Sequence, residues 1–341
     1  MRALWLTSAF ALLPLCNTAD ASTDPWAFPA GFYDAATGTG DTLEAQLAAI
    51  MADGHRQQRY GDFRQSAAIH DADPDNPGHI LLTYDRRSVD DEWDSGRTWN
   101  REHVWPVSRQ PGSSSNSERG NLGDPHALRP ATPGVNSSRG NKPFGFADSS
   151  GDFGAESNGF YFPGDDDKGD VARSLFYSAT RYGDTGISLV LGSPGSNQMG
   201  DLEALLAWHR DDPPDEFERR RNHTIYSQAE NPSYYTNNRN AYVDEPEFAY
   251  SVFALAGDAT LDFMIDQADL NAVLNNWGQT ATWVTGDFDL SGSVDQADLN
   301  AVLNNWGASG SPSFDGFAVP EPTATLLMAV LWLRHRYDRS T

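Results

Sequence analysis

The chain has 341 residues, of which 39% are hydrophobic and 21% charged, so we expect a folded protein with room for two domains rather than a disordered chain. Acidic residues number 48 against 24 Lys plus Arg, which gives a formal net charge of −24. Such a surface repels phosphate backbones at long range and excludes a protein that binds nucleic acids through a generally basic surface. It does not exclude an enzyme that concentrates positive charge and metal in one cleft.

The first predicted element is a removable secretory signal at residues 1–21. Arg2 precedes an apolar run, and Ala19-Asp20-Ala21 has the small-x-small form of a signal-peptidase site. The single cysteine, Cys16, lies inside this segment, so the mature chain is predicted to contain no disulfide. The alternative is an N-terminal helix of the fold. A signal predicts a protein that is secreted or held at the cell surface.

Residues 22–254 are predicted to form the main domain. Helical patterns occur near Leu43–Asp53, Val171–Tyr182 and Asp201–Arg210. The stretch 85–165 between the first two is rich in Gly, Ser, Asn and Pro and carries most of the polar chemistry, as loops that bear sites do.

Three segments of this stretch carry the functional argument: Trp99–Pro106, Gly123–Pro130 and Val135–Pro143. Together they offer imidazole, carboxylate, carboxamide and guanidinium groups. This set suits phosphodiester hydrolysis, because a neutral His can deprotonate water while oxygen ligands hold a hard cation and Arg balances the phosphate charge.

The runs Asn-Arg-Glu-His-Val-Trp-Pro, Asp-Pro-His-Ala-Leu-Arg-Pro and Val-Asn-Ser-Ser-Arg-Gly-Asn-Lys-Pro resemble bacterial endonuclease I, a family of secreted or periplasmic nucleases. The resemblance implies an α+β fold with a ββα-metal (His-Me finger) core, surrounded by helices and long loops. It implies that His103 is the general base and that Glu102 and Asn136 hold one divalent cation, for which we expect Mg²⁺. The remaining candidates are Arg129 and Arg139 as phosphate contacts, and Arg101, Asn141 and Lys142 as substrate-binding residues.

Adjacent side chains of a regular strand point to opposite faces, so Glu102 and His103 require a bulge or a strand end if both are to face one phosphate. We expect a strand that ends at His103, a short second strand near Ala127–Leu128, and a helix whose early turn presents Asn136. From the ordinary pKa of imidazole, activity is expected to rise between about pH 6 and 7.5.

Residues 255–308 contain a duplication in which Asp266–Gly278 and Asp295–Gly307 have the same sequence. Each copy follows an EF-hand-like loop of oxygen ligands, and the segment resembles the type I dockerin, a small all-α calcium module that docks onto cohesin. We expect Leu299, Val302, Leu303 and Trp306 to form one apolar face that the two helices bury. The first loop has Phe263 where glycine is expected and is predicted to bind more weakly. The predicted Ca²⁺ ligands are Asp287, Asp289, Ser291, Ser293, Asp295 and Asp298 in the second loop, and Asp258, Thr260, Asp262, Met264, Asp266 and Asp269 in the first.

The predicted C-terminal region, 309–341, is a linker followed by Pro320-Glu321-Pro322, an apolar run over 324–333 and three arginines. Ten apolar residues are too few to span about 30 Å of hydrocarbon as a helix. The order of parts resembles a PEP-CTERM sorting tail, which implies transient association with a membrane during export. The alternative is an apolar helix docked on the fold.

Two functions are therefore carried forward. The first is a secreted, metal-dependent endonuclease acting on DNA, with RNA as a second substrate, and with little sequence specificity because no base-reading helix is evident. The second is a non-catalytic matrix or scaffold protein that keeps a nuclease-like fold. In either case the repeat could attach the chain to a cohesin-like or other surface partner.

Overall fold

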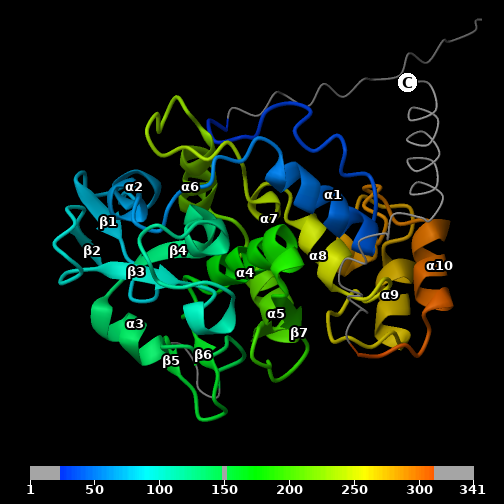
Figure 1. Cartoon of the computed structure of the whole chain (residues 1–341). Coiled ribbons are helices and arrows are strands. Elements are labelled where there is room, and N and C mark those ends of the chain that lie inside the picture. Colours follow the sequence, from blue (N-terminus) through cyan, green and yellow to red (C-terminus); the bar gives the residue numbers. More distant parts are fainter. Residues whose placement is uncertain (1–23, 148–151, 311–341) are drawn as a thin grey trace, which may run out of the picture.

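The computed structural model describes residues 24–147 and 152–310 and shows a mixed helical and small-sheet architecture (Figure 1). The predicted signal, and all of the predicted tail beyond residue 310, lie outside these ranges. The helices are α1 Gly40–Ala52, α2 Phe63–His70, α3 Pro133–Arg139, α4 Lys168–Tyr182, α5 Leu202–Asp211, α6 Glu216–Tyr226, α7 Ala241–Asp244, α8 Glu247–Phe253, α9 Gln267–Asn275 and α10 Gln296–Asn304. The strands pair as β1 His79–Leu81 with β2 Ser88–Asp90, β3 Asn100–His103 with β4 Leu128–Ala131, β5 Gly154–Ala155 with β6 Tyr161–Phe162, and β7 Ser188–Val190 with β8 Gln198–Asp201.

Helix α4 lies at the centre of the main domain, where α1 and α5 pack against it (Figure 1). Only Lys168 and Arg181 of this helix are not fully buried. The three helices predicted from periodicity correspond to α1, α4 and α5, so these predictions are confirmed. The polar side chains of a helix buried on all sides need hydrogen-bond or charged partners within the protein.

The unit β3, β4 and α3 has the strand, strand and helix order that was predicted. The strands are antiparallel, with Glu102 opposite Arg129, and His103 is the last residue of β3, as the alternation argument required. Pro133 stands at the start of α3, where no backbone N–H is needed, and Gly140 ends the helix with φ of 61°. Asn136 is therefore held on a short helix beside the end of β3.

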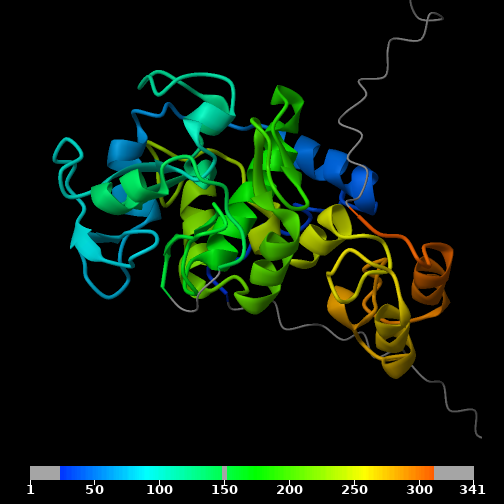
Figure 2. The same ribbon diagram turned by 90° about the horizontal axis from the view of Figure 1, so that it is seen from below.

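The duplicated segment forms a lobe at one end of the molecule, packed against α8 (Figure 2). Helices α9 and α10 each begin with a capping box, formed by Asp266 with Asp269 and by Asp295 with Asp298. Trp283 joins the lobe to the main domain. It is 1% exposed, and its backbone N–H donates to Oε2 of Glu247 in α8 at 2.8 Å.

The predicted burial of the repeated apolar face is wrong in part. Val302 and its counterpart Val273 are fully buried at the contact between α9 and α10. Leu303 and Trp306, however, are 52% and 49% exposed. Leu303 lies in the last turn of α10 and Trp306 follows the end of this helix, and the packing of α9 against α10 leaves both side chains half exposed. Across the two described ranges, no helix has both the length and the apolarity to cross a membrane.

Candidate active site

An open pocket of about 330 Å³ lies where β3 ends beside α3, and is called here the His103 pocket. It brings together side chains from two of the predicted segments, 99–106 and 135–143. Its walls are formed by Arg101, Glu102, His103, Pro106, Val107, Ser108, Asn136, Arg139, Gly140 and Asn141. The imidazole of His103 and the amide of Asn136, which were predicted to act at one site, therefore line the same pocket.

His103 is held as a neutral imidazole. Its ring is 8% exposed and stacks on the ring of Tyr60 with centroids 4.4 Å apart. Nε2 lies 3.1 Å from the carbonyl oxygen of Leu122, which can only accept, so Nε2 carries the proton and Nδ1 is the acceptor. Burial lowers the pKa of His103 to about 4, and Arg101 and Arg139 act in the same direction. The titration expected between pH 6 and 7.5 is therefore wrong, because that expectation used the pKa of an exposed imidazole.

Glu102 is 2% exposed, and its contacts orient the carboxylate. Oε1 accepts from the hydroxyl of Tyr84 at 2.8 Å and lies 3.2 Å from Nη1 of Arg139. Burial raises the pKa of Glu102, while Arg139 and the Tyr84 hydrogen bond oppose that rise. Among the described residues these contacts all fall on Oε1, which leaves Oε2 as the oxygen able to bind a cation.

Asn136 is oriented by its amide nitrogen. Nδ2 donates to Oδ1 of Asn100 at 2.8 Å, so the carbonyl oxygen Oδ1 is turned away from that contact. A carboxylate oxygen and an amide oxygen in one open pocket are hard ligands that suit Mg²⁺, which retains several waters. The residues present thus fit one divalent cation held by Glu102 and Asn136.

Arg139 was predicted as a phosphate contact, but the structure gives it another place. It is 0% exposed and donates Nη1 to the carbonyl oxygen of His103 at 3.0 Å and Nη2 to that of Val104. With its ion pair to Glu102, these bonds give both Nη atoms of the buried guanidinium partners within the protein. Arg139 also lines the His103 pocket, and its bonds to Glu102 and to the backbone of β3 make it a positioning residue.

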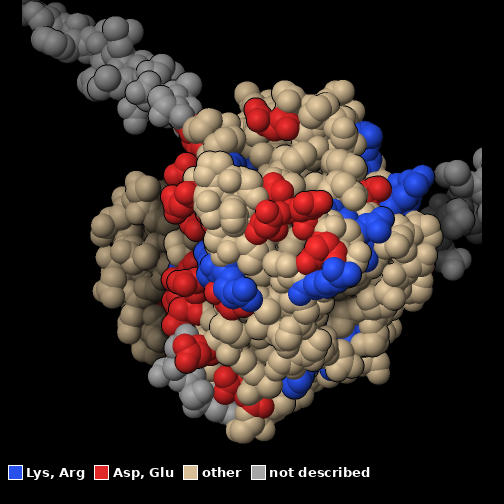
Figure 3. All heavy atoms as spheres, turned by 90° about the vertical axis from the view of Figure 1, so that its left-hand side faces the viewer, with Lys and Arg blue, Asp and Glu red and all other residues tan. Residues whose placement is uncertain are grey.

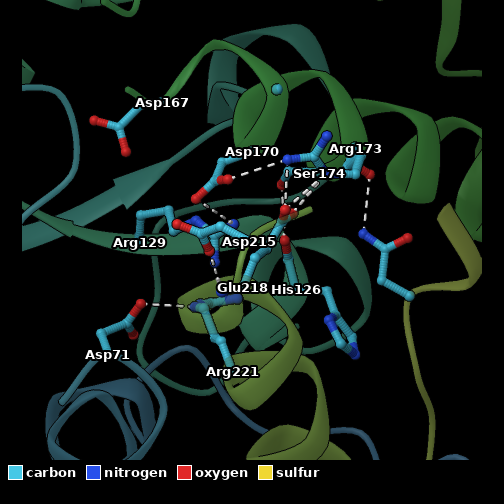
Figure 4. A network of polar contacts seen from close by, with 12 residues as sticks. Asp71, His126, Arg129, Asp167, Asp170, Arg173, Ser174, Asp215, Glu218 and Arg221 are labelled. Atoms are coloured by element: carbon cyan, nitrogen blue, oxygen red, sulfur yellow. Dashed lines mark hydrogen bonds and ion pairs between the residues drawn. The ribbon is translucent and has the colours of Figure 1, made fainter. Parts of the chain in front are cut away.

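Arg129 does not reach the His103 pocket. Its Nη2 lies 3.9 Å from Oδ2 of Asp170 in a buried network in which Arg173 also binds Asp170 and Glu218 (Figure 4). Since α4 is buried on all sides, Asp170 and Arg173 need charged partners there, and Arg129 is one of them. The predicted phosphate contact at Arg129 is not retained.

The three predicted substrate-binding residues differ in position. Arg101 lines the pocket and is half-buried, with its guanidinium 3.6 Å from the centroid of the Tyr60 ring. Asn141 also lines the pocket and is exposed. Lys142 is not among the lining residues, and its Nζ donates to the carbonyl oxygen of Ser138 at 2.6 Å. Arg101 is therefore the pocket cation that a substrate can reach.

Sequence reasoning missed the residues that hold the site in place. Tyr60 stacks on His103, Tyr84 binds Glu102, and the backbone carbonyl of Leu122 fixes the tautomer. Asn100 lies inside a quoted motif and could have been considered as a partner for Asn136. The two tyrosines lie far from the motif in sequence, and no local spacing marks them.

The second of the two loops predicted to bind calcium brings acidic groups together. Carboxylate oxygens of Asp287, Asp289 and Asp298 lie within 4.8 Å of one another, and in the described ranges only this loop forms such a group. Gly292 makes the sharp turn with φ of 88°. In the first loop Phe263 takes the same left-handed conformation, with φ of 58°, which costs a side chain more than it costs glycine. Weaker calcium binding by the first loop stays a prediction.

Comparisons with known proteins agree with the family that the sequence motifs resemble. The chain matches the family model described as Endonuclease I over residues 39–247. It is 37% identical over 244 residues to a protein of Bacillus subtilis (strain 168) named "Extracellular ribonuclease", covering 67% of this chain and 80% of that protein. A protein of the same name from Bacillus amyloliquefaciens is 36% identical over 252 residues, covering 70% of this chain and 83% of the relative. Taken with the ββα unit and its pocket, these matches show that the chain belongs to the endonuclease I family of nucleases.

Proposed function

We propose that this protein is a secreted nuclease that depends on a divalent cation and hydrolyses phosphodiester bonds in nucleic acids with little sequence specificity. The observation that supports the proposal most is the His103 pocket, where a neutral imidazole, an oriented carboxylate and a free amide oxygen meet. A scaffold protein without activity has no need of a buried carboxylate oriented by both Tyr84 and Arg139. Secretion agrees with the names of both relatives and with the predicted signal.

Each of these pocket residues would have its own role in hydrolysis. Nδ1 of His103 takes a proton from a water molecule, whose oxygen forms a new bond to phosphorus. The bond from phosphorus to the 3′ oxygen breaks, which leaves a 5′-phosphate and, once the 3′ oxygen gains a proton, a 3′-hydroxyl. Arg101 holds the phosphate from the open side of the pocket. A cation on Glu102 and Asn136 would supply charge stabilisation at the scissile phosphate.

The substrate proposal includes both RNA and DNA. The curated relatives are named ribonucleases, and this favours RNA for the present chain. The residues of the His103 pocket are suited to a phosphate group and not to the edge of a base, which favours low sequence specificity for either polymer.

Incubation of the mature protein with a single-stranded RNA, the matching DNA strand and a plasmid is expected to yield fragments with 5′-phosphates in Mg²⁺. Chelation by EDTA is expected to stop cleavage, because Glu102 and Asn136 would lose their cation. Gel electrophoresis and end-group labelling give the readout. Absence of cleavage of all three substrates across Mg²⁺, Mn²⁺ and Ca²⁺ would favour the scaffold function instead.

For the duplicated lobe, we propose that the loop from Asp287 to Asp298 binds Ca²⁺ and that the first loop binds it more weakly. Buried or clustered carboxylates favour an ion that neutralises them. Burial raises the pKa of Asp287 and that of Asp258, the latter to about 6. Docking to a cohesin-like or other surface partner stays a prediction, as does membrane association through the tail.

Calcium is expected to raise the unfolding temperature. At 100 times the dissociation constant the gain is about 3 kcal/mol for one site. Because Trp283 and α8 tie the lobe to the main domain, unfolding of the lobe should also weaken that contact. Differential scanning calorimetry of the full chain in CaCl₂ and in EDTA measures the effect.

Asp287→Asn should remove most of this gain, whereas Asp34→Asn, an exposed aspartate away from the loops, should keep it. Equal unfolding temperatures with and without Ca²⁺ in the unmodified protein would refute the calcium proposal. If Ca²⁺ raised the unfolding temperature of Asp287→Asn as much as that of the unmodified protein, the stabilising ion would bind at another site.

A further inference from the structure

A second pocket, of about 280 Å³, lies beside the start of α2 and is called here the Arg59 pocket. Its walls come from three parts of the chain: residues 56–59 with Asp62, the single residue Arg119, and residues 233–235 from the connection between α6 and α7. None of these residues lines the His103 pocket. The described structure therefore holds a second hollow that the proposed chemistry does not use.

The Arg59 pocket is basic in a protein whose net charge is −24. Arg56, Arg59 and Arg119 line it, against Asp62 as the one carboxylate of the wall. None of the three guanidinium groups forms an ion pair with a carboxylate of the described residues. Figure 3 shows Lys and Arg side chains at one edge of this side of the molecule and others near its centre, interspersed with Asp and Glu. Unpaired cations concentrated in one hollow attract an anion.

Aromatic rings accompany these cations. The guanidinium of Arg56 lies over the ring of Tyr235, 4.1 Å from its centroid, and its Nη1 donates to the carbonyl oxygen of the same residue at 3.0 Å. Tyr234 and Tyr235 are both half-buried wall residues. Planar groups interleaved with phosphate-binding cations form the type of surface on which single-stranded nucleic acids stack their bases.

The wall of the Arg59 pocket continues directly to the catalytic residue. Tyr60 follows Arg59, and its backbone N–H donates to the carbonyl oxygen of Glu118, the neighbour of Arg119, at 2.8 Å. The ring of Tyr60 stacks on His103, and Arg101 lies over the same ring. A strand that leaves the His103 pocket past Arg101 would therefore follow this segment to the second pocket.

We propose that the Arg59 pocket binds a single-stranded segment of the nucleic-acid substrate next to the cleaved bond. Arg59 and Arg119 contact its phosphates, and a base stacks on the Arg56 and Tyr235 pair. The inference rests on the proposed function, since it assigns a second contact to the same substrate. The strand must be single, because a base within a duplex is already stacked on its neighbours.

Binding can be tested without cleavage by placing all variants in the His103→Ala protein. Fluorescence anisotropy with a labelled 12-nucleotide strand, as RNA and as DNA, measures affinity over a range of salt concentrations. Arg59→Ala with Arg119→Ala is expected to weaken binding by about tenfold and to reduce the salt slope by about 1.4, as two lost phosphate contacts require. Tyr235→Ala is expected to weaken binding by about tenfold, and Tyr235→Phe by less than about twofold.

The matched control is Arg87→Ala with Arg210→Ala, two exposed arginines that line neither pocket, which should keep the affinity and the salt slope. Equal affinity of the Arg59 and Arg119 double variant and this control would overturn the proposal. So would an equal loss for a 12-base-pair duplex, or for polyphosphate, which carries no base. If these variants lose binding while the protein with an intact His103 cleaves nothing, the proposed function fails, and the Arg59 pocket is a binding site for single-stranded nucleic acid but not for a substrate.

Discussion

Replacing His103 by alanine is expected to slow cleavage of a single-stranded substrate by about 10²- to 10⁴-fold, the range that general base catalysis contributes. The variant loses the acceptor Nδ1 and also the ring that stacks on Tyr60. Substrate affinity should change much less, because Arg101 and the pocket oxygens remain in place. Initial rates over a range of substrate concentrations separate the two effects as kcat and KM.

Asn141→Ala serves as the matched control, because it removes an exposed side chain from the rim of the same pocket. We expect the kcat/KM of Asn141→Ala to fall by less than about tenfold, mainly through a higher KM, because the Asn141 side chain would contribute only to binding. Equal rates for His103→Ala and the unmodified protein would remove the imidazole from the mechanism.

The pH dependence follows from the environment of the ring. Burial lowers the pKa of His103 to about 4, so the imidazole is already neutral from pH 6 to 8. The rate should stay level over this interval and fall only as the pH drops through about 4, where the base gains a proton. Circular dichroism at each pH confirms that the protein is folded. A rate that rises through pH 6 to 7.5 would instead indicate an exposed imidazole.

Replacing Arg139 is the second change with a large expected effect. The Arg139→Met variant leaves the carboxylate of Glu102 buried without its counter-charge, at 2% exposure, and removes the bonds to the carbonyls of His103 and Val104. Breaking such a pair costs about 3–5 kcal/mol of folding stability. The loss should also raise the pKa of Glu102 further, because Arg139 opposes the effect of burial. Urea unfolding measures stability, and the Mg²⁺ dependence of cleavage measures the cation site.

Glu102→Gln in the Arg139→Met background separates positioning from folding. The neutral amide needs no counter-charge, so part of the lost stability should return, while activity should not. The single variant Glu102→Gln is expected to fold, to keep a hydrogen bond to Arg139 and to require much more Mg²⁺. If Arg139→Met kept full stability and an unchanged Mg²⁺ dependence, the positioning role would be refuted.

The family resemblance implied the ββα unit, and local strand geometry added one requirement to it. Strand alternation required a break at Glu102 and His103, and β3 does end there. The helix that presents Asn136 was expected from the same resemblance, and Pro133 does stand at its start. Arg129 and Arg139 were not distinguishable in this way, since each lies in a motif and only packing decides which way its side chain points. Tyr60 and Tyr84 approach His103 and Glu102 from distant segments, which one sequence without a fold cannot indicate.

The amino-acid sequence by itself therefore determined the set of reactive groups, the short elements that carry them and the duplicated acidic loops. The tertiary structure decided which charges are buried, which partners they have and which apolar side chains of the repeat remain exposed. The physical reason is that desolvation and pairing depend on groups far away in the chain. The ring of His103 is buried against Tyr60 and the carbonyl oxygen of Leu122, which lie outside the three motifs, and the fold brings Arg139 of one motif onto Glu102 of another.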